Sequence, residues 1–234
     1  MKSLARLTAA WVAKYCMPAT DICENILGLI ILTRQYRGIG GTTRYKTREK
    51  LWDSIVDKFE GQKIAYLEFG VHEGYSIKHI ARRHKNPESR FVGFDSFEGL
   101  PEDWRNFVNV YPANHFDVGG KTPDTDDPRV SFEAGWFNDT LPPFLQSFEL
   151  SDEENLIVHF DADLYSSTLY VLTQLHSVAD EYTAIFDELP GEEARALYDY
   201  SKSFQAEVEP LGYTGPGAMF PMRVALKITT NRKV

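Results

Sequence analysis

The chain has 234 residues, and its 43% share of hydrophobic residues is enough for one large α/β domain with an appendage. Its formal net charge of −9 at pH 7 would repel a phosphate backbone, which excludes nucleic acid as the principal partner and favours a small-molecule ligand. Its two cysteines, Cys16 and Cys23, are too few for a disulfide framework and lack zinc-binding spacing, so a cytoplasmic location is expected.

Residues 1–45 are expected to form an N-terminal helical segment, with a second apolar helix near 22–33. The most apolar run, 26–32, is far shorter than the roughly 20 residues of a membrane span, so no transmembrane segment is expected. An apolar stripe on the first helix needs a partner, so we predict that 1–45 forms a lid or a homodimer interface and that 46–234 forms the main domain. The stripe consists of Leu4, Leu7, Trp11 and Val12.

A string of basic residues follows this apolar helix. We interpret it as a solvated surface face, with contact to an anionic lipid or an anionic substrate as the alternative. The string consists of Arg34, Arg37, Arg44, Lys46, Arg48 and Lys50.

The segment 63–80 predicts a strand, a glycine turn and a helix. An apolar run ends in Glu68, the turn contains Gly70 and Gly74, and apolar residues then recur with helical spacing. Glycine allows the backbone to turn sharply and a ligand to lie against it at the helix N-terminus. Since an acid here would repel a pyrophosphate, Glu68 favours a cationic ligand, and S-adenosylmethionine (SAM) carries an ammonium and a sulfonium group.

The next strand, 90–95, ends in Asp95, about 20 residues beyond the glycine turn, where an acid usually holds ribose hydroxyls. We therefore predict that Asp95 binds the ribose of the cofactor. The alternative is that Glu68 and Asp95 are strand-end carboxylates that cap turns. Their order along the chain favours a binding site over that alternative.

Strands and helices then alternate, which predicts right-handed crossovers and a mostly parallel sheet. The irregular stretch 96–128 is expected to form part of the mouth of the active site, because long loops in compact domains are usually functional. A segment near 204–209 and the run 222–228 predict a closing hairpin. The intervening elements are strands at 129–134, 155–161 and 182–187 and helices near 139–148, 166–178 and 191–203.

Two later strands end in carboxylates, Asp161 after the first and Asp187 with Glu188 after the second. Ligands bind at the carboxyl ends of such strands, and if the two strands are neighbours the three side chains converge. Hard oxygen ligands suit Mg²⁺ better than zinc, so we predict a magnesium site. Asp163 is interpreted as a cap of the following helix.

Four strings, taken in order, resemble the macrocin O-methyltransferase family of class I SAM-dependent enzymes. They span 67–74, 95–101, 135–142 and 161–168. The resemblance implies a Rossmann-like α/β fold, with a seven-stranded, mostly parallel sheet and helices on both faces. It also implies SAM as the cofactor, a divalent cation, and methylation of a small-molecule hydroxyl, often on a sugar of a natural product.

The resemblance also assigns roles to individual residues. The methionine end of SAM lies at the glycine turn, the ribose at Asp95 and the adenine at 135–137, while Asp161 and Asp187 match the metal aspartates of the family. Glu188 departs from the pattern, which more often has a further Asp at this position. The residues predicted to bind the cofactor are Glu68, Gly70, Gly74, Ser76, Asp95, Ser96, Gly135, Trp136 and Phe137.

An alcohol is a poor nucleophile, so the reaction needs a base that removes its proton. Asp161 is the first choice for this base. His115, which lies in the mouth insertion, is the second catalytic candidate, and His72 and His159 are further alternatives.

Two other functions fit parts of the sequence. The Tyr-x-x-x-Lys spacing of Tyr198 and Lys202 is typical of NAD(P)-dependent reductases, but the glycine turn lacks a third glycine and carries Glu68 where phosphates would lie. A non-catalytic binding module on the same fold is the other alternative, because a fold does not guarantee activity.

Overall fold

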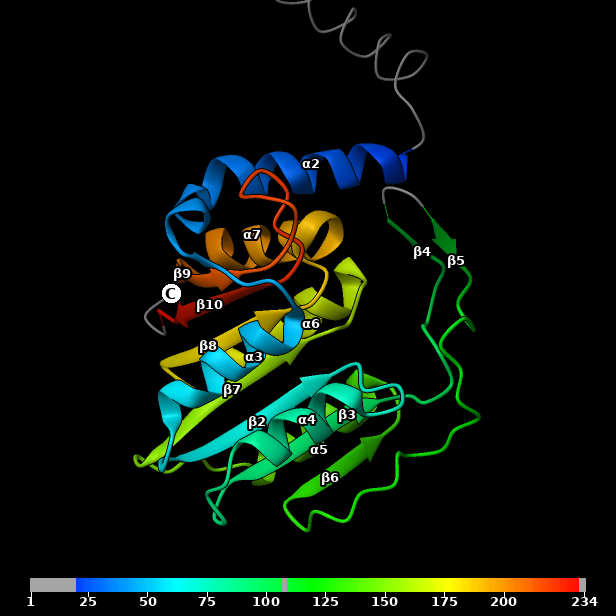
Figure 1. The fold of residues 1–234 in the computed structure, drawn as a ribbon. Coiled ribbons are helices and arrows are strands. Elements are labelled where there is room, and N and C mark those ends of the chain that lie inside the picture. Colours follow the sequence, from blue (N-terminus) through cyan, green and yellow to red (C-terminus); the bar gives the residue numbers. More distant parts are fainter. Residues whose placement is uncertain (1–19, 107–108, 232–234) are drawn as a thin grey trace, which may run out of the picture.

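The computed structural model describes residues 20–106 and 109–231. A central sheet lies between two layers of helices (Figure 1). The strands in chain order are β1 (Thr43–Arg44), β2 (Lys63–Phe69), β3 (Arg90–Asp95), β4 (Trp104–Arg105), β5 (Val110–Tyr111), β6 (Val130–Ala134), β7 (Glu154–Phe160), β8 (Glu181–Phe186), β9 (Glu207–Tyr213) and β10 (Val224–Thr229). β4 and β5 form a separate two-stranded sheet.

The main sheet has eight strands in the order β1-β9-β10-β8-β7-β2-β3-β6. β2 pairs in parallel with β3 and β7, and β7 with β8, as the alternation of strands and helices predicts. β10 runs antiparallel to both β8 and β9, which confirms the closing hairpin. The expected seven strands are therefore present, and the two-residue strand β1 adds an eighth at the edge, beside β9.

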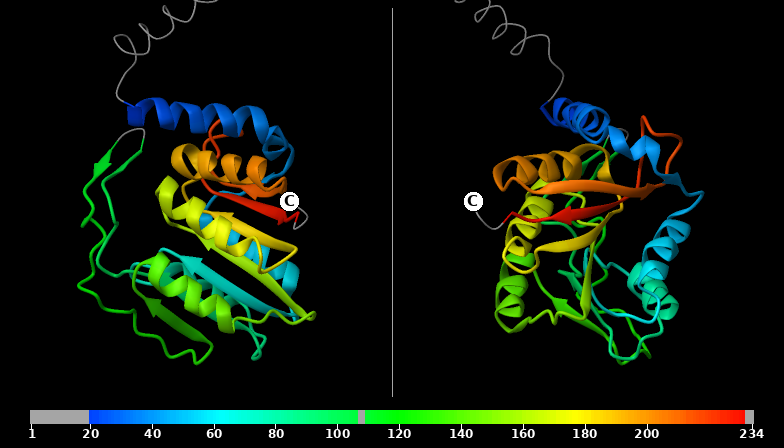
Figure 2. Two further views of the ribbon diagram at one scale, coloured as in Figure 1. Left: turned by 180° about the vertical axis from the view of Figure 1, so that it is seen from behind. Right: turned by 90° about the vertical axis from the view of Figure 1, so that its left-hand side faces the viewer.

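Helices cover both faces of the sheet (Figure 2). Along β2, successive side chains point to opposite faces: Ile64 and Tyr66 join the core beneath α3 and α4, while Ala65 and Leu67 join the core on the side of α6 and α7. The helices are α2 (Thr20–Gln35), α3 (Arg48–Val56), α4 (Tyr75–Arg83), α5 (Phe137–Ser147), α6 (Tyr165–Leu175) and α7 (Ala194–Ser203). Short 3₁₀ turns lie at η1 (Arg37–Gly41) and η2 (Asp57–Phe59), and η3 (Leu189–Glu193) is an irregular turn with a kink at Pro190 and Gly191.

The helix α2 packs onto η3 and α7 (Figure 1). Its residues Ile31 and Leu32 are buried in the main core. The apolar stripe predicted at Leu4, Leu7, Trp11 and Val12 lies outside the described residues. Within the part of the chain that the structure describes, no helix is long and apolar enough to cross a membrane.

Gly28 sets how closely α2 approaches η3. A Cβ atom added at Gly28 would lie 2.0 Å from the carbonyl oxygen of Gly191, so even one methyl group must push the helix away. We expect Gly28→Ala to lower the free energy of unfolding by about 1–3 kcal/mol, the usual cost of overpacking. Urea denaturation measures this loss. Gln35→Ala, at an exposed position of the same helix, is the control; equal effects of both changes would contradict this packing.

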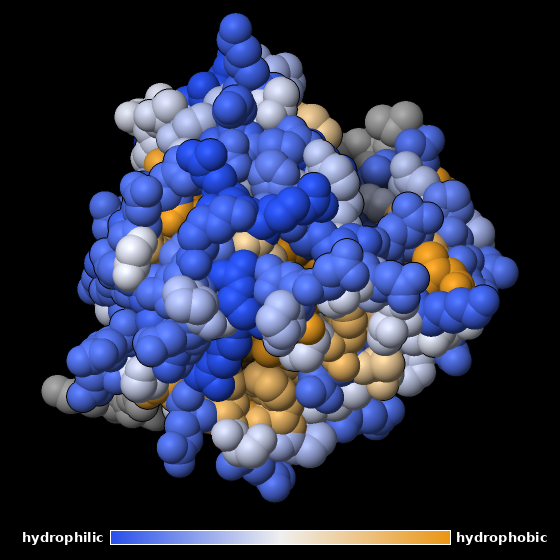
Figure 3. All heavy atoms as spheres, turned by 60° about the horizontal axis from the view of Figure 1, so that its bottom comes forward, coloured by the Kyte–Doolittle hydropathy of each residue, from blue (hydrophilic) through white to orange (hydrophobic). Residues whose placement is uncertain are grey.

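The insertion 96–128 contains the β4–β5 hairpin and runs alongside the carboxyl ends of the sheet strands (Figure 1). Its residues Leu100 and Phe116 line a cavity together with residues at those strand ends. The surface seen from the lower end of Figure 1 is mostly hydrophilic, with apolar side chains gathered near its middle (Figure 3). The expected position of the insertion at the mouth therefore agrees with the structure.

Candidate active site

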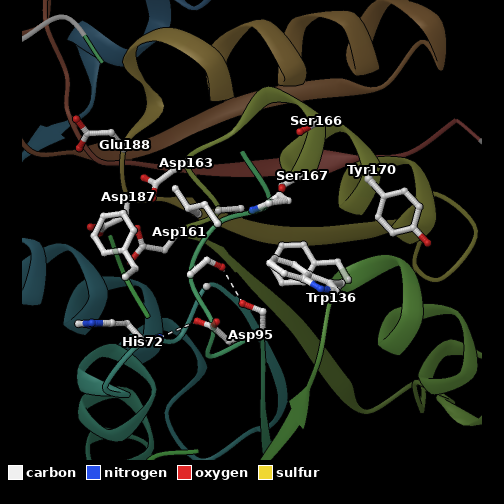
Figure 4. A pocket seen from close by; sticks show the side chains of 18 of the residues that line it. His72, Asp95, Trp136, Asp161, Asp163, Ser166, Ser167, Tyr170, Asp187 and Glu188 are labelled. Atoms are coloured by element: carbon white, nitrogen blue, oxygen red, sulfur yellow. Dashed lines mark hydrogen bonds between the residues drawn. The ribbon is translucent and has the colours of Figure 1, made fainter. Parts of the chain in front are cut away.

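A cavity of about 690 Å³ opens at the carboxyl ends of β2, β3, β7 and β8. Figure 4 places the carboxylates of Asp161, Asp163, Asp187 and Glu188 on one side of this cavity, and Trp136 on the other. The cavity thus has an acidic half, built from β7 and β8, and a half built from the ends of β2, β3 and β6. Ligands of open α/β sheets bind at this edge.

Gly70 begins the turn between β2 and α4 with a φ of 92°. A Cβ atom there would lie 1.9 Å from the carbonyl oxygen of Asp161, so only glycine allows the turn to lie this close to the end of β7. Gly74 has a φ of 73° and precedes the first turn of α4, and its N–H donates to the carbonyl of Val71. Among the described residues that line the cavity, Gly70 is present and Gly74 is not.

Asp95 ties the two turns of this half together. Its Oδ2 accepts hydrogen bonds from the backbone N–H groups of Val71 (2.7 Å) and His72 (2.8 Å), and its Oδ1 accepts one from Phe97 (2.7 Å). The Asp95 side chain also lines the cavity (Figure 4), and Ser96 is among the lining residues. The carboxylate therefore both fixes the glycine turn and borders the space expected for a ribose.

Glu68 and Ser76 lie behind the cavity wall, in a buried hydrogen-bond network. The Ser76 hydroxyl donates to Glu68 Oε1 (2.7 Å), and the Tyr66 hydroxyl donates to Glu68 Oε2. Tyr66 also lies 2.7 Å from His159 Nδ1. Since Glu68 is fully buried, it holds the turn from behind, and its direct contact with a cofactor stays a prediction.

The predicted adenine-binding residues form one wall of the cavity. Gly135, Trp136 and Phe137 follow β6 and all line it, as does Tyr170 from α6. Trp136 precedes the first residue of α5, and its carbonyl accepts hydrogen bonds from Asp139 and Thr140. The start of the helix thus fixes the backbone beside this large aromatic ring, and a flat aromatic wall of this kind suits a purine.

The acidic half contains carboxylates with unusual protonation behaviour. Burial, together with the neighbouring Asp187, raises the pKa of Asp161 to about 7. Burial raises the pKa of Asp163 well above its ordinary value, and the negative charge of Asp161 adds to this rise. Burial also raises the pKa of Glu188. Groups of this kind in a cleft are candidates for acid–base work.

Asp163 was expected to cap the following helix, and this prediction is wrong. The residue before α6 is Leu164, which makes no side-chain cap, and the backbone N–H of Tyr165 donates instead to Glu192 Oε2 (2.8 Å). Asp163 adopts a positive φ of 59° and lines the cavity. The carboxylate of Glu192 thus caps the helix, and Asp163 lines the cavity instead.

Asp187 is already paired with cationic side chains. Its Oδ2 lies 3.1 Å from Arg223 Nε and 3.7 Å from Arg48 Nη1, and its Oδ1 lies 3.8 Å from His159 Nε2. Burial opposes a charge on His159, but the nearby carboxylates of Asp187 and Glu68 outweigh it and raise the pKa of His159 to about 10. These contacts also lower the pKa of Asp187 against the effect of burial. Asp187 therefore stays charged.

The metal ligands expected from the sequence all line the same cavity. Nevertheless, no group of three His, Cys, Asp or Glu side chains in the described residues is arranged to hold a metal ion. The hard oxygen donors suit Mg²⁺ chemically, but Asp187 Oδ2 is paired with Arg223 and Arg48, and Asp187 Oδ1 lies 3.8 Å from Nε2 of His159. In this arrangement the donor set does not fit a divalent cation.

The predicted histidines lie in three different environments. His115 packs against Tyr111 and Phe116, and the described residues that line the cavity do not include it. His72 lines the cavity through the turn that Asp95 holds, and His159 is fully buried against Trp52. A catalytic role for His115 stays a prediction, and its position gives that prediction no support.

Three residues that face the cavity were not predicted as functional. Arg48 belongs to the basic string that was interpreted as a solvated face, and Arg223 lies just before β10. Both meet Asp187 only through the fold, so no local pattern marks them. The sequence did contain a pattern that could have marked Asp163, because Asp161 and Asp163 lie on either side of a single alanine at a strand end.

The fold and the cavity define a class of enzyme. A parallel sheet closed by an antiparallel strand, a glycine turn after β2 and an acid at the end of β3 are the features of class I SAM-dependent methyltransferases. A family model described as macrocin-O-methyltransferase (TylF) matches residues 37–211. The chain belongs to the macrocin O-methyltransferase family, and it is a SAM-dependent O-methyltransferase.

Several solved structures have similar folds. An O-methyltransferase from Bacillus cereus in complex with SAH has a TM-score of 0.49 and 15% identity, over 94% of this chain and 96% of that one. The O-methyltransferase TomG from Streptomyces achromogenes, involved in tomaymycin synthesis and in complex with SAM, has a TM-score of 0.48 and 16% identity, over 79% and 80%. A comparison with curated protein sequences gave no match. Similarities of this size carry no weight for the activity, so the assignment rests on the family match.

Proposed function

We propose that this protein transfers the methyl group of SAM to a hydroxyl of a small molecule, a sugar or a glycosylated natural product, with Asp161 as the base. The observation that carries the proposal is the two-sided cavity, in which Asp95 and Trp136 border one half and Asp161 and Asp163 the other. The first half suits the ribose and adenine of SAM, and the second suits a hydroxyl acceptor. The family match supports the reaction type.

In this mechanism the cofactor lies against the turn at Gly70, with its ribose toward Asp95 and its adenine toward Trp136. The acceptor hydroxyl enters the acidic half, and its oxygen attacks the methyl carbon in line with the breaking bond to sulfur. Asp161 takes the hydroxyl proton, and S-adenosylhomocysteine leaves as the neutral thioether. Positioning both reactants in one cavity supplies much of the acceleration.

Asp161 is suited to the base role by its place. It lies at the end of β7, beside the turn at Gly70, and its carboxylate faces the acidic half of the cavity (Figure 4). A base with a pKa of about 7 also matches a neutral working pH. Asp163, two residues further on, is the alternative base.

Magnesium assistance, which the sequence predicted, is the form of this proposal with less support. The carboxylates of Asp161, Asp187 and Glu188 line one cavity, and a divalent cation held there would lower the pKa of an acceptor hydroxyl. The pairing of Asp187 with two arginines argues against this form. No step of the mechanism given above uses a cation.

A screen of acceptors tests the substrate class. Purified protein is incubated with methyl-labelled SAM and two matched sets of acceptors, glycosylated compounds and their aglycones with free phenols. We expect label in the sugars of the glycosylated set. Label in the phenolic aglycones alone would contradict a sugar acceptor while leaving the methyltransferase assignment intact.

The other functions considered from the sequence can be tested by calorimetry. Tyr198 and Lys202 lie on α7, and the described residues that line the cavity include neither, so the reductase spacing has no support from the site. We expect heat of binding with SAM and none with NADH. A protein that binds SAM but releases no S-adenosylhomocysteine with any acceptor would favour the non-catalytic module.

We also propose a cytoplasmic homodimer that uses the 1–45 segment, in line with the few cysteines of the chain and with the outer face of α2. Ile26, Leu27 and Ile30 on this helix are 44%, 46% and 43% exposed, which is a large apolar surface to leave in water. We expect Leu27→Glu to convert the dimer into a monomer in sedimentation experiments. A wild-type monomer would rule out the dimer, and an intact dimer in the variant would place its interface elsewhere.

A further inference from the structure

Two arginines meet one carboxylate in the acidic half of the cavity. Arg223 Nε donates to Asp187 Oδ2 at 3.1 Å, and Arg48 Nη1 lies 3.7 Å from the same oxygen. The Asp187 side chain is only 6% exposed, whereas those of Arg223 and Arg48 are 24% and 38% exposed. The pair of guanidinium groups thus covers a buried carboxylate from the cavity side.

The register of the sheet fixes the first of these contacts. β10 runs antiparallel to β8, with Val224 opposite Phe186. Arg223 immediately precedes Val224, and Asp187 immediately follows Phe186, so the strand pairing brings the two side chains together. This ion pair is therefore part of the closing hairpin, unlike a surface salt bridge between mobile side chains.

The second contact is held by aromatic rings. The guanidinium of Arg48 lies 5.1 Å from the ring centroid of Trp52 and 5.0 Å from that of Tyr75. Arg48 is the first residue of α3, and a cation at a helix N-terminus is electrostatically unfavourable. The rings and Asp187 offset this cost and keep the positive charge at the cavity.

A divalent cation bound by Asp187 would lie close to both guanidinium groups. Like charges in a partly buried site repel strongly, because water screens them less than at the surface. To coordinate the ion, Oδ2 would have to leave the two arginines, and the other oxygen, Oδ1, is buried with Nε2 of His159 3.8 Å away. Binding of a cation and of the arginines at this carboxylate therefore exclude one another.

We infer that Arg223 and Arg48 take the place of a divalent cation at Asp187, so that this member of the family holds the acidic half of its cavity together without a metal ion. The inference rests on the proposed function, because it concerns the half of the cavity assigned to the acceptor. It makes the two arginines positioning residues, which fix Asp187 and neutralise its charge.

The test is calorimetry with Mn²⁺ as the probe, on the full chain with SAM present. We expect the wild-type protein to bind Mn²⁺ weakly, and Arg223→Gln, alone or with Arg48→Gln, to raise the affinity at least tenfold. Arg223→Lys keeps the charge and should give a smaller gain. Adding Asp187→Asn to Arg223→Gln should abolish the gain, since the carboxylate itself would be lost.

Arg83→Gln is the matched control, because it removes an arginine that pairs with an exposed carboxylate, Asp57, away from the cavity. It should leave the Mn²⁺ affinity unchanged. If Arg223→Gln leaves the Mn²⁺ affinity unchanged or lowers it, the inference is wrong. Should Arg223→Gln fail to fold, Arg48→Gln alone must still raise the affinity. A wild-type protein that does not bind SAM would instead refute the proposed function, so the two failures are distinguishable.

Discussion

Asp95→Ala is expected to weaken the binding of SAM by about 1.5–3 kcal/mol, the usual contribution of hydrogen bonds to a charged group. This loss corresponds to roughly a 10- to 150-fold rise in Kd. The reason is that the carboxylate borders the space assigned to the ribose and also holds the N–H groups of Val71 and His72 in the glycine turn. Isothermal titration calorimetry measures the change directly.

Two controls separate binding from folding. Asp103→Ala removes an exposed acid of the insertion that accepts a hydrogen bond from the backbone of Ala113, and it should leave the SAM affinity unchanged. Thermal melting of the Asp95→Ala protein without ligand reports how much the turn itself loosens. A folded Asp95→Ala protein with wild-type SAM affinity would remove the basis of the ribose assignment.

Asp161→Asn is expected to lower kcat by about 10²- to 10⁴-fold, the range that general bases contribute. The affinity for SAM should change little, because the substituted oxygen faces the acceptor half of the cavity. In the wild-type protein the rate should rise with pH through about 7, since the raised pKa of Asp161 keeps the base protonated and inactive at lower pH. The variant should lose this rise.

Asp163→Asn distinguishes the two neighbouring carboxylates. It leaves Asp161 in place and should retain the rise of the rate with pH. If Asp163→Asn abolishes turnover while Asp161→Asn stays near the wild-type rate, the base is Asp163. Single-turnover kinetics with preformed SAM complexes separates the methyl-transfer step from cofactor binding in both variants.

Much of the cofactor half could be predicted because its signals are local. The turn at Gly70 follows directly from an apolar run that ends in an acid, and Asp95 ends the next strand along the chain. Parallel pairing of these two strands then brings the two turns together. The position of Glu68 could not be predicted, because its burial depends on Tyr66 beside it and on His159 from β7.

The acidic half was harder to predict because its contacts join distant segments. Asp187 was recognised at a strand end, but its partners come from the first residue of α3 and from the residue before β10. Only the antiparallel register of β10 with β8 makes Arg223 a neighbour of Asp187. The sequence pattern favoured a metal ion at this carboxylate, because the sequence shows the hard oxygen donors but not the arginines that pair with them.

The most direct test of the account is the fate of the labelled methyl group of SAM in the presence of the acceptor mixture. We expect the wild-type protein to release one S-adenosylhomocysteine for each label that appears on an acceptor oxygen, and Asp161→Asn to bind SAM but transfer almost none. A wild-type protein that binds no SAM, or that places the label on carbon or nitrogen, would contradict the assignment of this cavity to O-methyl transfer.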